Sequence, residues 1–247
     1  MLKAVESRNR IRLATFNLKH GAYADGYMGH PKAVAEACAE LDADILALQE
    51  VDSRVPRSKF ANLARLAARA SGVEKPIFYK TMNFNIGSYG NALIIRGKVD
   101  IERQLPLKGD SRFRLSVGGL AIPPFGYEPR NAILAKTHIG ERQISIAATH
   151  LSTNPALGEQ QLANIMAQFD GTENPQILLG DLNRTRVELL ATRLLDTFEI
   201  AKSSATFPAY NPKRQIDHIA VKGLEICTVE SRQMPISDHL ALVVDVE

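Results

Sequence analysis

The chain has 247 residues, of which 45% are hydrophobic and 23% charged, and its net charge is +3. These values are typical of a globular protein with a hydrophobic core, and the mildly basic charge permits an anionic substrate without demonstrating one. No stretch approaches 18 continuous apolar residues and the first ten residues lack an apolar core, so we expect no signal peptide and no membrane span. We therefore expect a cytoplasmic protein.

Apolar residues recur with two periods that alternate along the chain. Spacing of three and four residues predicts helices, and short runs rich in Ile, Val, Leu and Ala predict strands. In chain order, the predicted elements are strand 11–17, helix 34–41, strand 45–48, helix 63–70, strands 92–95, 132–137 and 144–149, helix 162–169, strand 177–179, helix 187–195 and strands 216–221 and 240–246.

Strands and helices intermix without a strict βαβ rhythm, which favours mixed sheets with helices outside over a doubly wound parallel sheet. Gly140 to Arg142 predicts a hairpin turn between two strands. Residues 21–31 and 104–129 are predicted to be surface loops near the mouth of a site. No repeat or linker divides the chain, so residues 1–247 are predicted to form a single domain.

The two cysteines, Cys38 and Cys227, belong to no CxxC or Cys/His cluster. Their spacing does not match a zinc site and does not indicate a disulfide, so we expect two buried free thiols.

Short polar motifs sit at the ends of the apolar runs, where side chains emerge from a sheet edge. Five follow a run and one opens a run, and each contains Asp, Glu, Asn or His: residues 15–17 (TFN), 49–52 (QEVD), 149–151 (THL), 180–183 (GDLN), 215–218 (QIDH) and 237–239 (SDH). Carboxylate and amide oxygens are hard ligands that suit Mg²⁺ or Mn²⁺ rather than zinc, and histidines supply donors for phosphate oxygens.

Each motif has a structural alternative when it is taken alone. Asn17 could end a strand with a side-chain turn, Glu50 could be a solvated residue after a strand, and Asp181 could form a turn after Gly180. A lone histidine such as His150 is more often a satisfied core residue than a catalyst. Their joint recurrence at strand ends favours a functional site.

The order TFN, QEVD, THL, GDLN, IDHI, SDH resembles the endonuclease/exonuclease/phosphatase superfamily, with its deoxyribonuclease-I-like fold, from residue 11 to the C-terminus. The resemblance implies an α/β (α+β) fold, a four-layer α/β/β/α sandwich in which two mixed β-sheets pack face to face with helices outside. It also implies a Mg²⁺ or Mn²⁺ site with Glu50 as the principal ligand, Asn17 helping to bind metal and phosphate, and Asp238 beside the metal.

The same resemblance implies the catalytic roles. Asp181 orients or deprotonates the attacking water, and Asn183 holds a phosphate oxygen and positions that water. His239 contacts the scissile phosphate, with its ring oriented by Asp217. His150 donates to a phosphate oxygen and assists the leaving group. The motif at His150 favours the deoxyribonuclease I, sphingomyelinase, deadenylase and inositol-phosphate phosphatase branch over abasic-site endonucleases.

Several further polar residues have both a functional and a structural interpretation. Asn91 and Arg130 each precede or open a strand and are predicted to contact substrate. The structural alternative is that each only begins its strand. His218 is expected to be structural. Arg54, Arg57 and Lys59 form either a basic lip for an anionic chain or, as the favoured interpretation, a solvated charge cluster.

The sequence thus predicts a metal-dependent phosphoric ester hydrolase, a phosphodiesterase or nuclease, that is monomeric and has no membrane anchor. The absence of Trp and the small net charge disfavour a binder of long duplexes but leave a short single strand open. Two alternatives stay open: a phospholipid, sphingomyelin or small-molecule phosphoesterase, and a non-catalytic binding module that keeps the fold.

Overall fold

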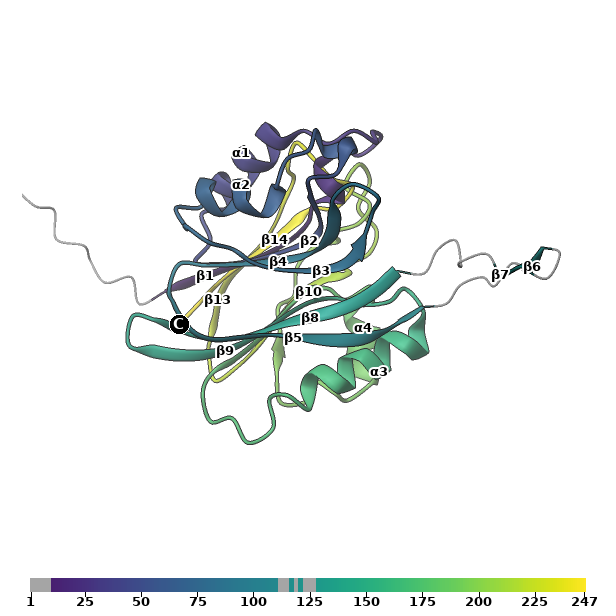
Figure 1. The fold of residues 1–247 in the computed structure, drawn as a ribbon. Helices are drawn as coiled ribbons and strands as arrows, with labels where there is room; N and C mark the ends of the chain where they lie inside the picture. The colour runs from purple at the N-terminus through teal and green to yellow at the C-terminus, as the bar shows by residue number, and fades with distance from the viewer. Residues whose placement is uncertain (1–9, 111–115, 118–119, 122–127) are drawn as a thin grey trace, which may run out of the picture.

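The structure is a computed structural model that describes residues 10–110, 116–117, 120–121 and 128–247. Two six-stranded sheets pack against each other (Figure 1). The first has the order β13 (Ile226–Arg232), β14 (Ala241–Val246), β1 (Ile11–Asn17), β2 (Ile45–Ser53), β4 (Ser88–Ile95), β3 (Ile77–Asn83). The second has the order β11 (Glu199–Ile200), β12 (Asp217–Lys222), β10 (Gln176–Asp181), β9 (Arg142–His150), β8 (Glu128–Ile139), β5 (Lys98–Asp110).

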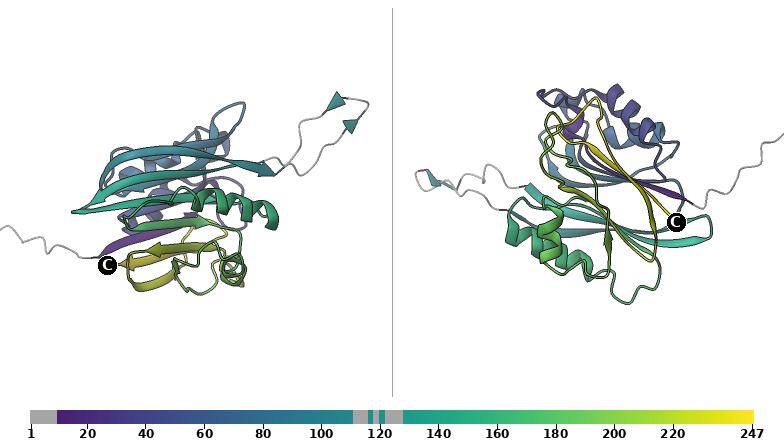
Figure 2. Two further views of the ribbon diagram at one scale, coloured as in Figure 1. Left: turned by 90° about the horizontal axis from the view of Figure 1, so that it is seen from below. Right: turned by 180° about the vertical axis from the view of Figure 1, so that it is seen from behind.

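Helices cover the outer face of each sheet. Helices α1 (Pro31–Leu41) and α2 (Leu63–Ala70) lie on the first sheet, and α3 (Pro155–Met166) and α4 (Arg186–Ala191) lie on the second, as the front and rear views show (Figures 1 and 2). Two 3-10 turns, η1 (Lys19–Gly21) and η2 (Pro56–Ser58), and a short pair, β6 (Ser116–Val117) and β7 (Leu120–Ala121), complete the described elements. The predicted four-layer α/β/β/α sandwich with mixed sheets is confirmed.

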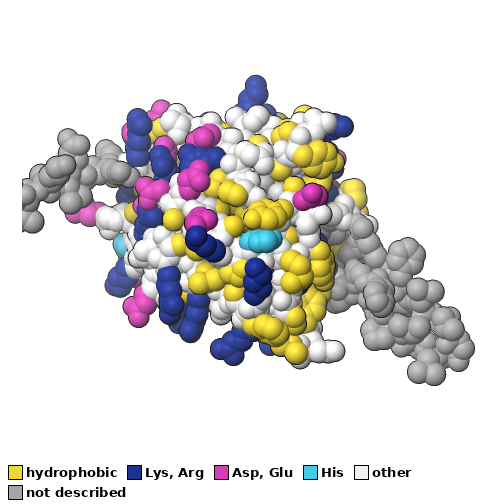
Figure 3. Space-filling model, turned by 90° about the horizontal axis from the view of Figure 1, so that it is seen from above, with side chains coloured by type: hydrophobic (Ala, Val, Ile, Leu, Met, Phe, Trp, Pro, Cys, Tyr) yellow, Lys and Arg dark blue, Asp and Glu magenta, His cyan; other side chains and the backbone are white. Residues whose placement is uncertain are grey.

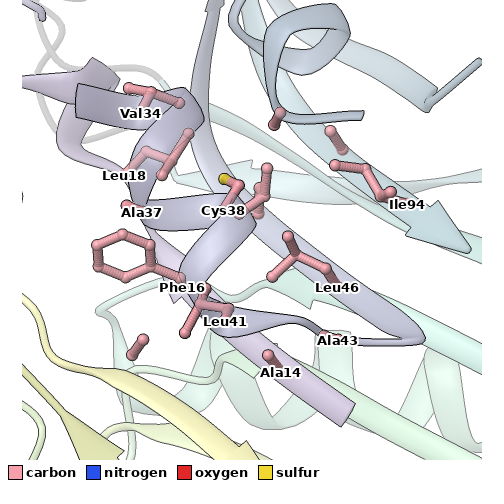
Figure 4. Packing of buried hydrophobic residues seen from close by; sticks show 14 of the residues in the cluster. Ala14, Phe16, Leu18, Val34, Ala37, Cys38, Leu41, Ala43, Leu46 and Ile94 are labelled. Carbon is pink, nitrogen blue, oxygen red and sulfur yellow. The ribbon is translucent and has the colours of Figure 1, made fainter. Parts of the chain in front are cut away.

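Strand β1 shows how the sequence builds these layers. Ile11 and Leu13 face the second sheet and join the core between the sheets, whereas Ala14 and Phe16 face α1. This alternation is the period of a strand that is covered on both faces. Figure 4 shows the α1 side of the layer, where side chains of the stripe Val34, Ala37, Cys38 and Leu41 lie over β1 and β2.

Helix starts follow local capping chemistry. The side chains of Asn62 and Asn154 accept from backbone N–H groups in the first turns of α2 and α3, and Thr185 forms a capping box with Glu188 at α4. Periodicity alone misplaced the helix predicted at 162–169, because Asn154 and Pro155 begin α3 seven residues earlier than its first predicted residue.

Edge strands account for most of what the pattern missed. Strands β3, β5 and β13 were not predicted; each pairs on one side only, and many of their side chains are exposed, so the apolar signal is weak. The predicted loop 104–129 is therefore wrong over Gln104–Asp110, which continues β5. Most of the remainder of that prediction lies outside the described residues. Residues 22–30 are irregular, as predicted, apart from the isolated bridge between Ala22 and Gly29.

Two further findings bear on the class of protein. In the parts of the chain that the structure describes, no helix is long and apolar enough to cross a bilayer. Both cysteines are free, as predicted; Cys38 is buried, but Cys227 is partly exposed because it lies on the edge strand β13.

Candidate active site

Strand register brings three of the predicted catalytic residues side by side. β10 runs parallel to β9 and antiparallel to β12, so Asp181 lies beside His150 on one strand and Asp217 on the other. All three side chains are buried, and Asp181 Oδ2 lies 3.5 Å from His150 Nε2. The adjacent ends of these three strands therefore carry a compact cluster of carboxylates and an imidazole.

Gly180 makes this approach possible. Its φ is +150°, and a Cβ there would lie 1.9 Å from the carbonyl oxygen of Thr149. Only glycine lets β10 come this close to β9, and this close approach sets the position of Asp181.

The first sheet contributes Asn17 and Glu50 to the same place. Glu50 adopts φ +56° where the pairing of β2 with β4 is interrupted between Leu48 and Val51. This irregularity aims its carboxylate at the end of β1. Asn17 Nδ2 donates to Glu50 Oε1 and to Asp181 Oδ2, both at 3.1 Å, so a single amide joins the acidic groups of the two sheets.

His239 enters from the segment between β13 and β14. Ser237 Oγ donates to the Asn17 carbonyl at 2.6 Å and accepts from His239 N at 3.0 Å, which fixes this segment against β1. His239 Nδ1 lies 2.9 Å from Asp217 Oδ2, and its Nε2 lies 3.8 Å from Asp181 Oδ2. The predicted contact between Asp217 and His239 is therefore present.

The buried charges set the protonation states. Burial lowers the pKa of His239, but the charge and hydrogen bond of Asp217 outweigh it and raise that pKa to about 10. Burial lowers the pKa of His150 well below its ordinary value, and the Arg130 charge adds to this. Burial, together with the Asp217 charge, raises the pKa of Asp181. At neutral pH, Asp181 thus lies between a cationic and a neutral imidazole.

Asp217→Asn is expected to lower the pKa of His239, because it removes the main charge that keeps the ring protonated. If catalysis needs the cationic ring, the alkaline limb of the pH–rate profile should move to lower pH. The stabilising effect of protonated His239, present below pH 6.5 and lost as pH rises through about 10, should shrink as well. Histidine NMR titration and thermal melts measure both effects; an unchanged His239 titration in a folded variant would refute the pairing.

These side chains meet in a cleft of about 800 Å³. Its walls include seven of the residues predicted from the sequence: Glu50, Arg130, His150, Asp181, Asn183, Asp238 and His239. Asn17 and Asp217 are almost fully buried and contact these wall residues from behind.

A family model described as the endonuclease/exonuclease/phosphatase family matches residues 14–239, which span every motif of the cleft. The chain belongs to this family. The solved structure of an endonuclease/exonuclease/phosphatase from Beutenbergia cavernae DSM 12333 is similar over 97% of this chain and 72% of that one, with a TM-score of 0.75 and 20% identity. D. rerio TDP2 in complex with a single-strand DNA product is similar over 97% and 99% of the two chains, with a TM-score of 0.69 and 13% identity.

A curated relative shares less of its length. The UPF0294 protein VV2535 of Vibrio vulnificus (strain YJ016) is 25% identical over 140 residues, which are 53% of this chain and 49% of that protein. The chain thus spans about half the length of the curated relatives it matches.

Two family motifs are held in ways that the sequence does not reveal. Asn183 has φ +52°, its N–H donates to Asp181 Oδ1 at 2.9 Å, and its Nδ2 donates to the Leu151 carbonyl at 2.9 Å. These two hydrogen bonds fix the orientation of the Asn183 side chain, including its oxygen, at the cleft wall. Asp238 Oδ2 lies 3.9 Å from Lys19 Nζ at the cleft wall.

The predicted substrate contacts differ in placement. Arg130 lies in the cleft and pairs with Glu128 at 2.8 Å. Asn91 is buried, and its Nδ2 donates to Asn131 Oδ1 at 2.9 Å, so its amide joins the two sheets. His218 is buried with Nε2 2.7 Å from the Arg184 carbonyl, in agreement with the structural role expected for it.

The sequence interpretation missed several wall residues, among them Lys19, His20, Tyr89, Glu128, Phe207 and Arg214. None belongs to a family motif, and their distance along the chain gives no local signal. The favoured interpretation of Arg57 as part of a solvated cluster is wrong, because its guanidinium makes a bidentate pair with buried Asp52. Arg54 and Lys59 are exposed as expected.

The donor set fits a hard divalent cation. Burial raises the pKa of the partly buried Glu50 carboxylate, although the Asn17 hydrogen bond and the His239 charge act against it. A bound divalent cation would favour the ionised form further. Asp181, Asp217 and His239 also place ligand atoms within 4.8 Å of one another. We favour the Glu50 side, because Asp217 Oδ2 is already bonded to His239 Nδ1 and a metal between these two atoms would break that bond.

Proposed function

We propose that this protein is a Mg²⁺- or Mn²⁺-dependent phosphodiesterase that cleaves a phosphate ester by in-line attack of water. The observation that carries this proposal is the position of Asp181. Its carboxylate accepts from Asn17 and lies 3.5 Å from the ring nitrogen of neutral His150 and 3.8 Å from that of cationic His239. A water-activating group placed between donors of different protonation state suits ester hydrolysis.

The residues divide the work as follows. Asp181, whose pKa is raised, accepts a proton from the attacking water. His239, held cationic by Asp217, donates to a phosphate oxygen. Asn183, whose Nδ2 is bonded to the Leu151 carbonyl, positions the water by accepting from it through the side-chain oxygen. His150 lies beside Asp181 on β9, the neighbour of β10 on the side away from β12, and donates toward the leaving oxygen.

Glu50, with Asp238 nearby, would hold the cation. Bound there, Mg²⁺ would neutralise charge on the phosphate and the leaving oxygen. In this structure Asn17 supports the site by holding Glu50. Its side-chain oxygen accepts from Lys19 N at 3.0 Å, and its side-chain nitrogen faces the carboxylates. Direct ligation by Asn17 would require its amide to turn over.

A short single-stranded nucleic acid is the first candidate substrate. D. rerio TDP2, a structural neighbour, is described with a single-strand DNA product. The cleft carries Lys19, Arg130 and Arg214, together with the ring of Phe207, whose centroid lies 4.8 Å from that of His239. Basic groups with an adjacent aromatic ring suit such a strand.

The proposal predicts Mg²⁺-dependent hydrolysis of bis-p-nitrophenyl phosphate, followed by a preference within a panel of single-stranded DNA, RNA, duplex DNA and phospholipid. A variant with Asp181→Asn and His239→Ala, purified in parallel, controls for contaminating hydrolases. Cleavage of phospholipid alone would favour the lipid alternative. Absence of turnover on every substrate would favour the non-catalytic module and contradict the proposal.

A further inference from the structure

A second pocket opens beside the catalytic cleft. It has a volume of about 700 Å³ and shares Arg57 and Phe84 with the cleft wall. It is lined by Tyr27, Met28, Val55, Pro56, Arg57, Asn83, Phe84, Asn85 and Ile86. The catalytic roles proposed above use none of these residues, yet a group attached to a phosphate in the cleft would be next to them.

The pocket presents apolar and aromatic surface to solvent. Tyr27 is 67% exposed and Phe84 38% exposed, and Met28 and Ile86 are exposed as well. The face seen from above shows hydrophobic side chains gathered on its right-hand side, the end at which the strands β3 and β4 are joined in Figure 1 (Figure 3). Contiguous exposed apolar surface beside a polar cleft is typical of a binding site.

Arg57 forms the boundary between pocket and cleft. Its Nε and Nη2 donate to the two oxygens of Asp52 at 2.8 and 2.9 Å, and Asp52 is 0% exposed. The guanidinium carbon lies 5.9 Å from the ring centroid of Tyr27, 5.4 Å from that of Phe84 and 5.7 Å from that of Tyr89. Because Asp52 neutralises its charge, this fixed planar group serves better as a stacking surface than as a phosphate anchor.

The walls are held by backbone contacts. Gly29 N donates to the Arg57 carbonyl at 2.7 Å, and His20 Nε2 lies 2.8 Å from the Tyr27 carbonyl. Across the pocket, Gly87 has φ +84° and a Cβ there would lie 2.6 Å from the Arg54 backbone, so the β3–β4 turn packs directly on the end of β2. These contacts fix the two walls of the pocket relative to each other.

We propose that this pocket is a subsite for a planar aromatic ring carried by the phosphate ester, a nucleobase or another aryl group. The inference rests on the proposed function only in placing the phosphate in the cleft. Tyr27, Phe84 and the Arg57 plane offer stacking faces, and Asn83 and Asn85 offer exposed amides to the edge of a ring. An acyl chain would use the apolar walls but leave these amides and the guanidinium without a function.

Equilibrium binding of phosphonates tests the subsite without turnover, because their carbon–phosphorus bond resists hydrolysis. In Mg²⁺ buffer, phenylphosphonate should bind about tenfold more tightly than methylphosphonate, in line with ring stacking. Hexylphosphonate, which has as many carbons as the phenyl compound, should bind close to methylphosphonate. The methylene analogue of thymidine 5′-phosphate distinguishes the two ring sources, since binding tighter than that of phenylphosphonate indicates a nucleobase.

The variant Tyr27→Leu with Phe84→Leu keeps apolar volume and removes both ring faces. It should bind phenylphosphonate and methylphosphonate within about twofold of each other. Phe60→Leu is the matched control, because Phe60 is 60% exposed and is no part of either wall, and it should keep the tenfold preference.

Three results would overturn the proposal: equal affinity of the wild type for phenyl and methyl compounds, hexylphosphonate binding as tightly as phenylphosphonate, or a ring preference that survives in the folded double variant. If the protein binds the ring selectively but hydrolyses no ester, the subsite is upheld and the proposed function is rejected. The two proposals can therefore fail separately.

Discussion

Asp181→Asn is expected to lower kcat by about 10²–10⁴-fold, the range for loss of a general base. Asparagine keeps the size of the side chain and one oxygen to accept from Asn183 N, but it cannot carry the negative charge or accept a proton. The same change should lower the pKa of His239, because Asp181 is one of the charges that raise it. Steady-state kinetics and histidine NMR measure the two effects.

The fold should survive this substitution. Burial raises the pKa of Asp181, so its ionised form does not stabilise the folded state, and the main loss is the hydrogen bond from Asn17, worth about 1 kcal/mol. We expect Tm to fall by no more than about 4 °C. Asp42→Asn is the matched control: it also removes an ion-paired carboxylate, here with Arg96, and should keep kcat within about twofold. A fully active Asp181→Asn enzyme would reduce Asp181 to a turn residue and weaken the role of Asn183.

Glu50→Gln is expected to weaken Mg²⁺ or Mn²⁺ binding by more than about 100-fold, a loss larger than that usual for residues that only orient metal ligands. The carboxylate is lost while Asn17 can still contact the side-chain oxygen. Asp181→Asn should weaken metal binding much less, which separates the ligand from the base. Calorimetric titration measures the affinity.

Metal removal gives the corresponding loss of activity. EDTA should abolish turnover by the wild type, and added Mg²⁺ or Mn²⁺ should restore it. Glu36→Gln, at an exposed site on α1 that pairs with Lys32, should bind metal like the wild type. Full activity in chelator, or unchanged metal affinity of Glu50→Gln, would exclude the proposed metal site.

Local pattern in the sequence was enough to predict mixed sheets with helices outside and to give the order of the motifs, whereas the four-layer arrangement was implied by the resemblance to the family. The apolar run at residues 11–17 predicts a strand and the stripe Val34, Ala37, Cys38, Leu41 predicts a helix; both are observed, and in the structure they pack on each other. Such patterns are local because burial of one face depends only on the period of the element.

Tertiary structure alone decided which of these residues meet and what else surrounds them. Register between β9, β10 and β12 puts His150 and Asp217 on either side of Asp181, and the side chain of Asn17 ties that sheet to Glu50 on the other. The hydrogen bond from Asn17 to Asp181 joins residues 164 positions apart in the sequence, so no local period can predict it.

The apolar pocket beside the cleft has the same origin. Tyr27, Arg57 and Phe84 come from three separate segments, each of which taken alone resembles an ordinary surface loop or an exposed edge strand. The sequence therefore determined the strands and helices and the chemistry available at the strand ends. The pairing of strands and the packing of loops, which depend on distant backbone hydrogen bonds, determined the site itself.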